Sequence, residues 1–390
     1  MKKLISNFFL IIFIACIASS QTQRVPVFIS GTEGYKSFRI PAIISLKDGT
    51  LLAFAEGRIN GSGDFGDINI VMKRSTDKGK TWTACKTLVD NSTLQAGNPA
   101  PVVDMADENY PKGRIFLFYN TGNNHEGEVR KGKGLREGWY IISTDGGHTW
   151  SEPVNITQQV HRPKQPGVNP AYNFREDWRS YANTPGHAMQ FANGKYKGRI
   201  YVIANHSAGD PQKNFTDYDV HGFYTDDHGK TFHLSQTLNV PGSNECMAAA
   251  LSNDKLMVNA RNQKGSPRQR IVAISSNGGV SWDTSYYDNN LPDPVCQGSL
   301  LNLNLRKHKQ ALAFCNDNDT MHRDNLTVRI SYDEGKTWSK QFVIDKSPAD
   351  YKGDFTAYSD IVQISKNKIG VLYEFDNYKQ IAFKIIKIKR

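Results

Sequence analysis

Five copies of one eight-residue pattern constrain the fold of this 390-residue chain more than any other feature. The pattern is Ser or Thr, any residue, Asp or Asn, any residue, Gly, any residue, Thr or Ser, and an aromatic residue. Its copies occupy 75–82, 143–150, 225–232, 275–282 and 331–338. The hydroxyl and the carboxylate or amide can bond nearby backbone groups, and the Gly permits a positive φ, so each copy predicts a hairpin turn. A calcium loop is disfavoured, because it needs more oxygen ligands and a Glu at its twelfth position.

Short alternating strands flank these turns, and helical periodicity is nearly absent. Strands are predicted at 68–74, 114–119, 199–204 and 327–330, and a last strand with a charged edge at 384–390. About 50 to 80 residues separate successive turns, which suits four-stranded units that close radially, and the chain holds about six of them. No Pro/Ser-rich linker divides the sequence. We therefore expect an all-β fold, a six-bladed β-propeller, as a single domain over residues 21–390.

Residues 1–20 have the pattern of a secretory signal peptide. Lys2 and Lys3 precede an apolar run from Phe8 to Ile14, and small residues follow. The run is too short to span a bilayer as a mature helix, and no later stretch approaches that length. We expect an exported protein that is periplasmic, at the cell surface or secreted, without stable membrane insertion. Lipidation at Cys16 is the alternative.

Charge and cysteine usage narrow the range of partners. The formal net charge of +10 favours anionic partners, but no Lys/Arg block is dense enough for a nucleic-acid arm, so no nucleic acid is expected. After the leader the chain has four cysteines, and disulfides and isolated buried thiols are equally open for them: Cys85, Cys246, Cys296 and Cys315. No Cys or His cluster has zinc-ligand spacing. The motifs do not encode an oligomeric state, and a monomer is expected.

Arg39 is the least expected residue of the N-terminal region. It lies between Phe38 and Ile40, with Pro41 next, in a segment that otherwise reads as a buried strand. Burying a guanidinium costs several kcal/mol unless an anion meets it. That anion is a neighbouring carboxylate, a ligand or both, and a purely structural salt bridge is the simpler alternative.

The Phe38-Arg39-Ile40-Pro41 motif and the five turns together resemble the exo-sialidases (neuraminidases) of bacteria and animals, over essentially the whole chain after the leader. That family pairs such a motif with Asp-box turns on a six-bladed propeller. The resemblance implies an exo-α-sialidase that removes terminal sialic acids from sialylated glycoconjugates by a retaining mechanism. This chemistry requires no cofactor and no metal.

The resemblance also implies how the substrate is held. A sialoside carries a carboxylate on the carbon that is cleaved, and arginine forks bind carboxylates bidentately. Arg39, Arg261 and Arg323 match the three arginines that the family uses for this carboxylate. Glu374 matches the late carboxylate that braces the first arginine, which supplies a counter-charge for Arg39.

The catalytic residues follow from the same resemblance. Tyr358 matches the nucleophile and Glu245 its general base, since a phenol with a pKa near about 10 needs a hydrogen-bonded base to attack at neutral pH. Asp64 matches the acid/base, with Asp67 as the competing candidate. The glycine-rich loop 61–67 is expected to shield Asp64 from water and raise its pKa.

Two further parts of the site are less defined. Arg58 and Asp104 are expected near O4 of the sugar. The aromatic loop 167–186 either lines the N-acetyl or aglycone side of the pocket or packs on the propeller's flank. Two alternative functions remain. A trans-sialidase, including an intramolecular one, would keep all these residues. A sialoside-binding lectin would be expected to have lost the nucleophile, the base or the acid, and all three are present here.

Overall fold

The computed structural model of the chain describes residues 23–305 and 311–388. The predicted signal peptide at 1–20, with Cys16, lies outside the described residues. Within them, helix is confined to α1 (Glu126–Val129), α2 (Thr157–Val160) and the 3-10 turn η1 (Lys213–Phe215). No helix in this part of the chain is long and apolar enough to cross a membrane. The near absence of helix predicted from the sequence is confirmed.

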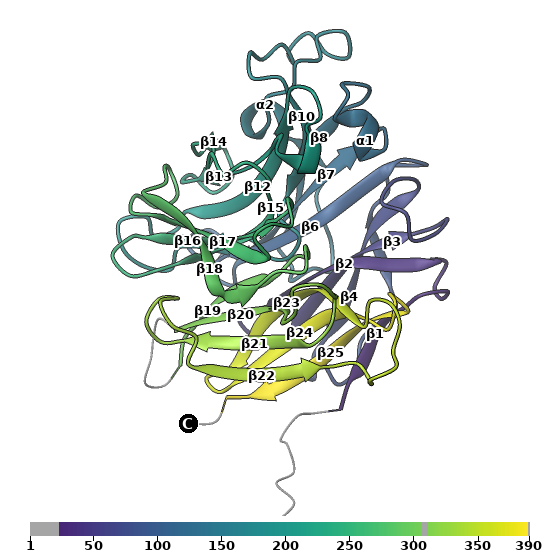
Figure 1. Cartoon of the computed structure of the whole chain (residues 1–390), viewed down its shortest axis with the longest axis vertical. Coiled ribbons are helices and arrows are strands. Elements are labelled where there is room, and N and C mark those ends of the chain that lie inside the picture. Colours follow the sequence, from purple (N-terminus) through teal and green to yellow (C-terminus); the bar gives the residue numbers. More distant parts are fainter. Residues whose placement is uncertain (1–22, 306–310, 389–390) are drawn as a thin grey trace, which may run out of the picture.

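The strands form sheets that follow one another in chain order around a common centre (Figure 1). The first is an eight-stranded sheet of β2 (Ser37–Ser45), β3 (Leu51–Arg58), β4 (Ile68–Ser75), β5 (Lys86–Val89), β6 (Gln95–Asp104), β7 (Arg114–Gly122), β8 (Arg136–Ser143) and β9 (Val154–Asn155). Its two halves, β2–β5 and β6–β9, are each antiparallel. One parallel pair, Ile68 with Gln95, joins them.

Four further sheets complete the ring. The second contains β10 (Trp178–Asn183), β11 (Met189–Gln190), β12 (Ile200–Ala208), β13 (Tyr218–Thr225) and β14 (His233–Leu234). The third contains β15 (Ser243–Ala250), β16 (Leu256–Asn262), β17 (Gln269–Ser275) and β18 (Thr284–Pro292). The fourth contains β19 (Ser299–Leu303), β20 (Ala311–Asp317), β21 (Leu326–Ser331) and β22 (Lys340–Asp345). The strands predicted from the sequence coincide with β4, β7, β12 and β21.

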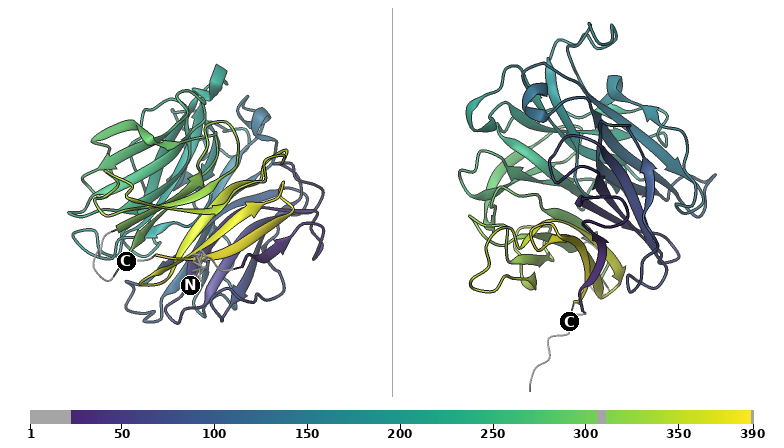
Figure 2. Two further views of the ribbon diagram at one scale, coloured as in Figure 1. Left: turned by 60° about the horizontal axis from the view of Figure 1, so that its bottom comes forward. Right: turned by 90° about the vertical axis from the view of Figure 1, so that its right-hand side faces the viewer.

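The last sheet joins the two ends of the described chain. It contains β23 (Thr356–Ser365), β24 (Lys368–Phe375) and β25 (Gln380–Lys387), and β1 (Val25–Ile29) pairs with β25. Figure 2 shows this N-terminal strand beside the C-terminal strands. The last strand of the chain, β25, was predicted at a sheet edge. This placement is wrong, because β25 lies between β1 and β24. The fold is an all-β propeller in which four sheets stand separately and eight strands form one continuous sheet.

Each Asp-box turn is held by its own side chains. In the first copy, Ser75 Oγ donates to Asp77 Oδ1 and accepts from the Gly79 N–H, both at 2.8 Å. Asp77 Oδ1 also accepts from the N–H groups of Lys80 and Thr81 at 3.0 Å, and Thr81 Oγ1 donates to Oδ2 at 2.7 Å. The bonds from Thr81, then those from Ser75 and Lys80, lower the pKa of Asp77 to about 2. The predicted structural role of the turn is confirmed.

The glycine of each Asp box marks the contact with the preceding part of the ring. Gly79 has a φ of 85°, and a Cβ at this position would overlap the ring of Phe383 on β25. The same relation pairs each later Asp-box glycine with a side chain on an earlier strand: Gly147 with Leu52, Gly229 with Phe116, Gly279 with Tyr201 and Gly335 with Met257. The turns therefore also set the spacing between successive groups of strands.

Three imidazoles are packed together in the second sheet and the segment before it. His161, His206 and His221 are buried, and Trp178 stacks on His206 with ring centroids 3.6 Å apart. His206 Nδ1 and His221 Nδ1 are 2.9 Å apart, whereas neither ring nitrogen of His161 makes a well-formed hydrogen bond with the described residues. Burial lowers the pKa of His161 and His206 well below the ordinary 6.5, and that of His221 to about 3. All three rings are therefore neutral at physiological pH.

A matched pair of glycine substitutions tests the spacing role of the Asp box. Gly49 and Gly79 both have a φ of 85°, but a Cβ at Gly49 meets nothing within 4 Å. Gly49→Ala should cost about 1–2 kcal/mol of unfolding free energy from backbone strain alone. Gly79→Ala should cost about 1–3 kcal/mol more, because Phe383 must move. Denaturant unfolding measures both, and equal losses would contradict the spacing role.

The histidine cluster predicts an acid-sensitive fold. Below about pH 6.5 these histidines bind protons in the unfolded chain but stay neutral in the folded one. The free energy of unfolding therefore decreases as the pH falls below this value. Each ring contributes a loss of about 1.4 kcal/mol per pH unit. His161→Phe should remove the contribution of one of the three rings. The unfolding free energy of the variant should then fall less steeply than that of the wild type from pH 7.5 to 5.5. Identical slopes for wild type and variant would rule out the explanation.

Candidate active site

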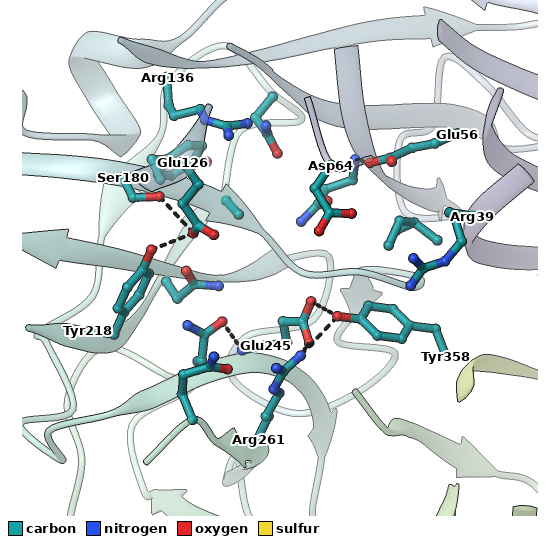
Figure 3. A pocket seen from close by; sticks show the side chains of 18 of the residues that line it. Arg39, Glu56, Asp64, Glu126, Arg136, Ser180, Tyr218, Glu245, Arg261 and Tyr358 are labelled. Carbon is teal, nitrogen blue, oxygen red and sulfur yellow. Dashed lines mark hydrogen bonds and ion pairs between the residues drawn. The ribbon is translucent and has the colours of Figure 1, made fainter. Parts of the chain in front are cut away.

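One pocket collects side chains from all around the ring (Figure 3). The first half of the eight-stranded sheet, with the loop from β3 to β4, contributes Arg39, Ile40, Glu56, Arg58 and Asp64. The second half, with α1, contributes Gln95, Asn98, Asn120, Glu126 and Arg136. The remaining lining residues are Ser180, Tyr181, Ala182, Asn205, Phe215, Tyr218, Asn244, Glu245, Arg261, Gln263, Arg323 and Tyr358. The structure thus brings together eight of the nine residues expected in the site, seven on the wall and Glu374 behind it.

β-bulges direct these side chains into the pocket. Register breaks occur between Arg39 and Ala42 in β2, Gly97 and Ala100 in β6, Trp178 and Tyr181 in β10, Ser243 and Cys246 in β15, and Thr356 and Ser359 in β23. Each break spans or adjoins a residue of the pocket wall. A bulge sets two residues against one on the partner strand, so it bends the strand and re-aims a side chain. The repetition at five strands gives the pocket its polar wall.

The bulge in β2 is strained and is held by Glu374. Ile40 adopts a φ of 58°, a conformation that costs a β-branched residue about 1–3 kcal/mol. The fully buried Glu374 accepts through Oε1 from Arg39 Nε at 2.6 Å and from the Ile40 N–H at 2.9 Å. Its Oε2 accepts from the Tyr358 N–H at 3.3 Å. Burial alone would lower the pKa of Arg39, but the Glu374 carboxylate raises it above the ordinary value.

Tyr358, Glu245 and Arg261 form one hydrogen-bonded unit. The Tyr358 hydroxyl donates to Glu245 Oε1, while Arg261 Nη1 donates to Glu245 Oε2 at 2.6 Å and to Tyr358 Oη at 3.0 Å. Burial, followed by the charge of Glu245, raises the pKa of Tyr358 well above 10, although Arg261 opposes this shift. The phenol therefore keeps its proton, and a carboxylate that can accept the proton is in place.

Two more guanidiniums flank the same phenol. The Cζ atoms of Arg39 and Arg323 lie 5.4 and 5.7 Å from the Tyr358 ring centroid. Arg323 Nη1 donates to Tyr378 Oη at 3.0 Å, and its nearest ion-pair partner, Asp354, is 3.8 Å away. With Arg261, these groups surround the phenol with positive charge. Such an arrangement suits a small anion bound by guanidinium forks.

Asp64 lies in the pocket, but the expected rise of its pKa is wrong. Partial desolvation by the surrounding pocket wall acts to raise the pKa of Asp64, but its side chain stays largely open to solvent, and the charges of Arg58, Arg39 and Arg323 hold the pKa below its usual 3.8. The side chain is 76% exposed, and Oδ1 accepts from Arg58 Nη1 at 2.8 Å. The competing Asp67 is absent from the pocket wall.

Asp104 does not join Arg58, so this expectation is also wrong. The ten-residue β6 carries Gln95 and Asn98 at the pocket end, and Asp104 lies six residues beyond Asn98, about 20 Å along an extended strand. There Asp104 is fully buried and accepts from Gln190 Nε2 at 2.7 Å, with His228 Nδ1 at 2.9 Å.

Glu56 takes the position beside Arg58 that was expected for Asp104. Its Oε2 accepts from Arg58 Nε at 3.1 Å and Nη2 at 2.7 Å, and its Oε1 accepts from the Asn98 N–H at 3.0 Å. The sequence reasoning missed Glu56, although it is a lone acid in an apolar strand, the same signal that identified Glu374. Arg136 and Glu126 were missed as well, and no sequence pattern distinguishes them.

The aromatic loop 167–186 lies partly on the flank and partly at the pocket, and which side of a substrate it would face stays a prediction. Its first part packs on the flank, where Tyr172 Oη donates to Glu137 at 2.8 Å. Its second part forms β10, whose Ser180 and Tyr181 line the pocket.

The structure also decides between disulfides and free thiols. All four cysteines that it describes are free thiols: Cys85, Cys246, Cys296 and Cys315.

The fold and the pocket together define a β-propeller with an arginine-lined pocket at the meeting point of its sheets. The model of the BNR repeat-like domain matches residues 49–371. With this match and the relatives described next, the chain belongs to the BNR/Asp-box sialidase family.

Curated relatives and a solved structure support this membership. An exo-alpha-sialidase of Arthroderma benhamiae is 30% identical over 89% of this chain and 80% of its own length. A sialidase of Micromonospora viridifaciens is 28% identical over 89% of this chain, which spans only about half (51%) of that relative. The solved structure of the Hadza microbial sialidase Hz136 has a TM-score of 0.78 and 25% identity, covering 94% of this chain and 68% of its own.

Removing the charge of Glu374 tests its role as the brace of Arg39. Glu374→Gln leaves a buried guanidinium without its anion, which should lower the free energy of unfolding by about 3–5 kcal/mol. Glu137→Gln is the matched control, because Glu137 is half-buried and bonds Tyr172 and Asn155 but forms no ion pair with the described residues. The control should change stability by less than about 1 kcal/mol. Denaturant unfolding compares them, and similar losses would contradict the brace.

Proposed function

We propose that the chain is a retaining exo-α-sialidase that hydrolyses terminal sialic acids from sialylated glycoconjugates. The observation that carries this proposal is the Tyr358–Glu245–Arg261 unit inside a ring of guanidiniums. A carboxylate nucleophile would be repelled by the substrate's carboxylate, whereas a neutral phenol is not. The lectin alternative is disfavoured, because nucleophile, base and acid candidates all line one pocket.

In the proposed mechanism, Arg39, Arg261 and Arg323 bind the substrate carboxylate. Tyr358 attacks the anomeric carbon while its proton passes to Glu245, and a covalent sialyl-enzyme forms. Asp64 gives a proton to the departing glycosidic oxygen. Water then attacks the anomeric carbon and gives a proton to Asp64, while the bond from that carbon to Tyr358 Oη breaks and the phenolate takes back its proton from Glu245. The sugar leaves with its original anomeric configuration. No step requires a cofactor.

The low pKa of Asp64 fits this scheme through substrate binding. The charges of Arg58, Arg39 and Arg323 favour the ionised carboxylate of Asp64, which cannot act as an acid. A bound substrate carboxylate offsets the charges of Arg39 and Arg323. The pKa of Asp64 then rises toward the range that an acid catalyst needs, because an added anion favours the neutral carboxyl.

We also propose that the propeller has six blades in one domain. The halves β2–β5 and β6–β9 of the eight-stranded sheet share only one bridge pair, and they count as two blades beside the four separate sheets. The five Asp boxes support this count, since each packs on the group of strands before it.

Export through residues 1–20 is proposed on sequence alone. N-terminal sequencing of the mature protein recovered outside the producing cells would test it.

Hydrolysis of a fluorogenic α-sialoside by the purified protein tests the function. Tyr358→Phe should lower kcat at least about 10³-fold, because the nucleophilic oxygen is lost. Tyr286→Phe, which removes the same oxygen from an exposed ring outside the pocket, should leave kcat unchanged.

The product distinguishes hydrolysis from transfer. Free sialic acid released first as the α-anomer supports a retaining hydrolase, and a product lighter by one water identifies intramolecular transfer instead. No release by the wild type would refute the enzyme, and full activity of Tyr358→Phe would refute the nucleophile.

A further inference from the structure

A second hollow lies at the other end of the strands from the pocket. It has a volume of about 570 Å³ and lies between the first Asp-box turn and the last sheet. Tyr358 in the pocket and Ile364 in this hollow are both on β23, six residues apart, which is about 20 Å along an extended strand. The apolar residues that line the hollow are Val25, Ile364, Phe383 and Ile385. We call this hollow the basal groove.

The floor of the basal groove is preformed by packing. The ring of Phe383 is 1% exposed and makes an edge contact with Trp82, with ring centroids 5.6 Å apart. A Cβ at Gly79 would overlap the same ring, so the Asp-box turn is seated directly against β25. The three aliphatic side chains of the groove are half-buried. The groove therefore keeps its shape and leaves part of its apolar surface open to solvent.

Exposed lysines surround the basal groove. Three of them line it, and two more adjoin Lys368 in the turn between β23 and β24 and on β25: Lys78, Lys80 and Lys368, with Lys366 and Lys387. No ion pair joins any of the five to a described residue, whereas Lys384, also on β25, lies 3.8 Å from Asp345. Asp77, in the same Asp-box turn, uses both of its oxygens for the bonds of the turn. The rim of the groove therefore has a net positive charge.

An apolar groove inside a ring of cations fits a partner that is both apolar and anionic. A bilayer that contains anionic lipids offers both, since its phosphates attract lysines and its acyl region accepts apolar side chains. A nucleic acid would meet the lysines but would leave the apolar groove without a partner. The combination of charge and apolar surface therefore favours lipid.

Two other occupants lack the required charge. A second copy of the chain, related by a two-fold axis through the groove, would place the lysines of one copy against those of the other. The chain's own residues 1–22 precede Gln23, which lines the groove, but their sequence contains no Asp or Glu. Neither occupant supplies an anion for the five ammonium groups.

We propose that the basal groove and its five lysines dock the protein on the surface of an anionic lipid bilayer. The lysines contact the head groups, and the aliphatic side chains of the groove contact the acyl region next to them. Lysines at such a surface each strengthen binding about fivefold, and salt screens this contribution. Because the groove and the pocket lie at opposite ends of β23, the pocket of the docked protein faces away from the bilayer.

Co-sedimentation of the purified protein with lipid vesicles tests the docking. Vesicles of equal parts phosphatidylglycerol and phosphatidylcholine should bind the wild type at low salt, and molar salt should release it. Vesicles of phosphatidylcholine alone should not bind it. Wild-type protein that sediments equally with both kinds of vesicle, or with neither, overturns the proposal.

Matched charge reversals locate the contact. Lys80→Glu with Lys368→Glu should weaken binding to the anionic vesicles at least about 25-fold, because two of the lysines are lost. Lys164→Glu with Lys352→Glu changes the net charge equally at exposed positions outside the groove and should weaken binding less than about fivefold. Equal unfolding free energies verify that both double variants keep the fold. Equal losses of binding in the two variants overturn the assignment to the groove.

A second pair of variants tests the apolar part of the contact. Ile364→Thr should weaken binding about fourfold, because an ethyl group no longer enters the acyl region. Ile29→Thr, the same change at a 45% exposed residue of β1 outside the groove, should leave binding unaltered. Equal binding by these two variants overturns the role of the groove. Dimerisation of the wild type without lipid, abolished by Lys80→Glu with Lys368→Glu, would assign the groove to a second copy instead and overturn the proposal.

Discussion

One buried carboxylate, that of Glu374, connects the fold to the site. It accepts from the Arg39 side chain and the Ile40 backbone on β2, and from the Tyr358 backbone on β23. These strands belong to the first and last sheets of the chain, so the same group joins the two sheets where the ring closes and aims two residues of the pocket. A buried carboxylate without a cation would be costly, and so would a buried guanidinium without an anion. The Glu374 carboxylate and the Arg39 guanidinium therefore stabilise each other. The stability of the fold and the geometry of the pocket depend on this one ion pair.

Balanced charge is the rule along most of the pocket wall. Glu374 compensates Arg39, Glu56 compensates Arg58 and Glu245 compensates Arg261, so the wall is rich in donors without an unchecked positive charge. The glutamates also restrict the arginines to single orientations, since each guanidinium has a fixed partner on one side and the pocket on the other. Preorganised donors of this kind bind an anion without paying for reorientation at the moment of binding. Arg136 departs from this rule, because it forms no ion pair with the described residues and its Nη1 donates to Gln95 Oε1.

Distortion of the strands is what makes a polar pocket possible in an all-β ring. A regular strand alternates its side chains between two faces, and both faces of a propeller blade pack against neighbouring blades. The bulges in β2, β6, β10, β15 and β23 interrupt that alternation near the pocket and turn polar side chains inward. The strained backbone at Ile40 is part of the bulge in β2. Its cost is offset by the Asp-box turns and by the apolar clusters between the sheets.

The amino-acid sequence by itself determined the Asp-box turns, the strands beside them and the motif around Arg39, because the bonds that hold such a turn connect groups within eight residues. The family resemblance carried over most of the site. Only the tertiary structure decided that Asp104 lies at the wrong end of β6, since alternation identifies a strand but not which of its ends meets the pocket. It alone decided the low pKa of Asp64, where the charges of Arg39 and Arg323 act from distant parts of the chain.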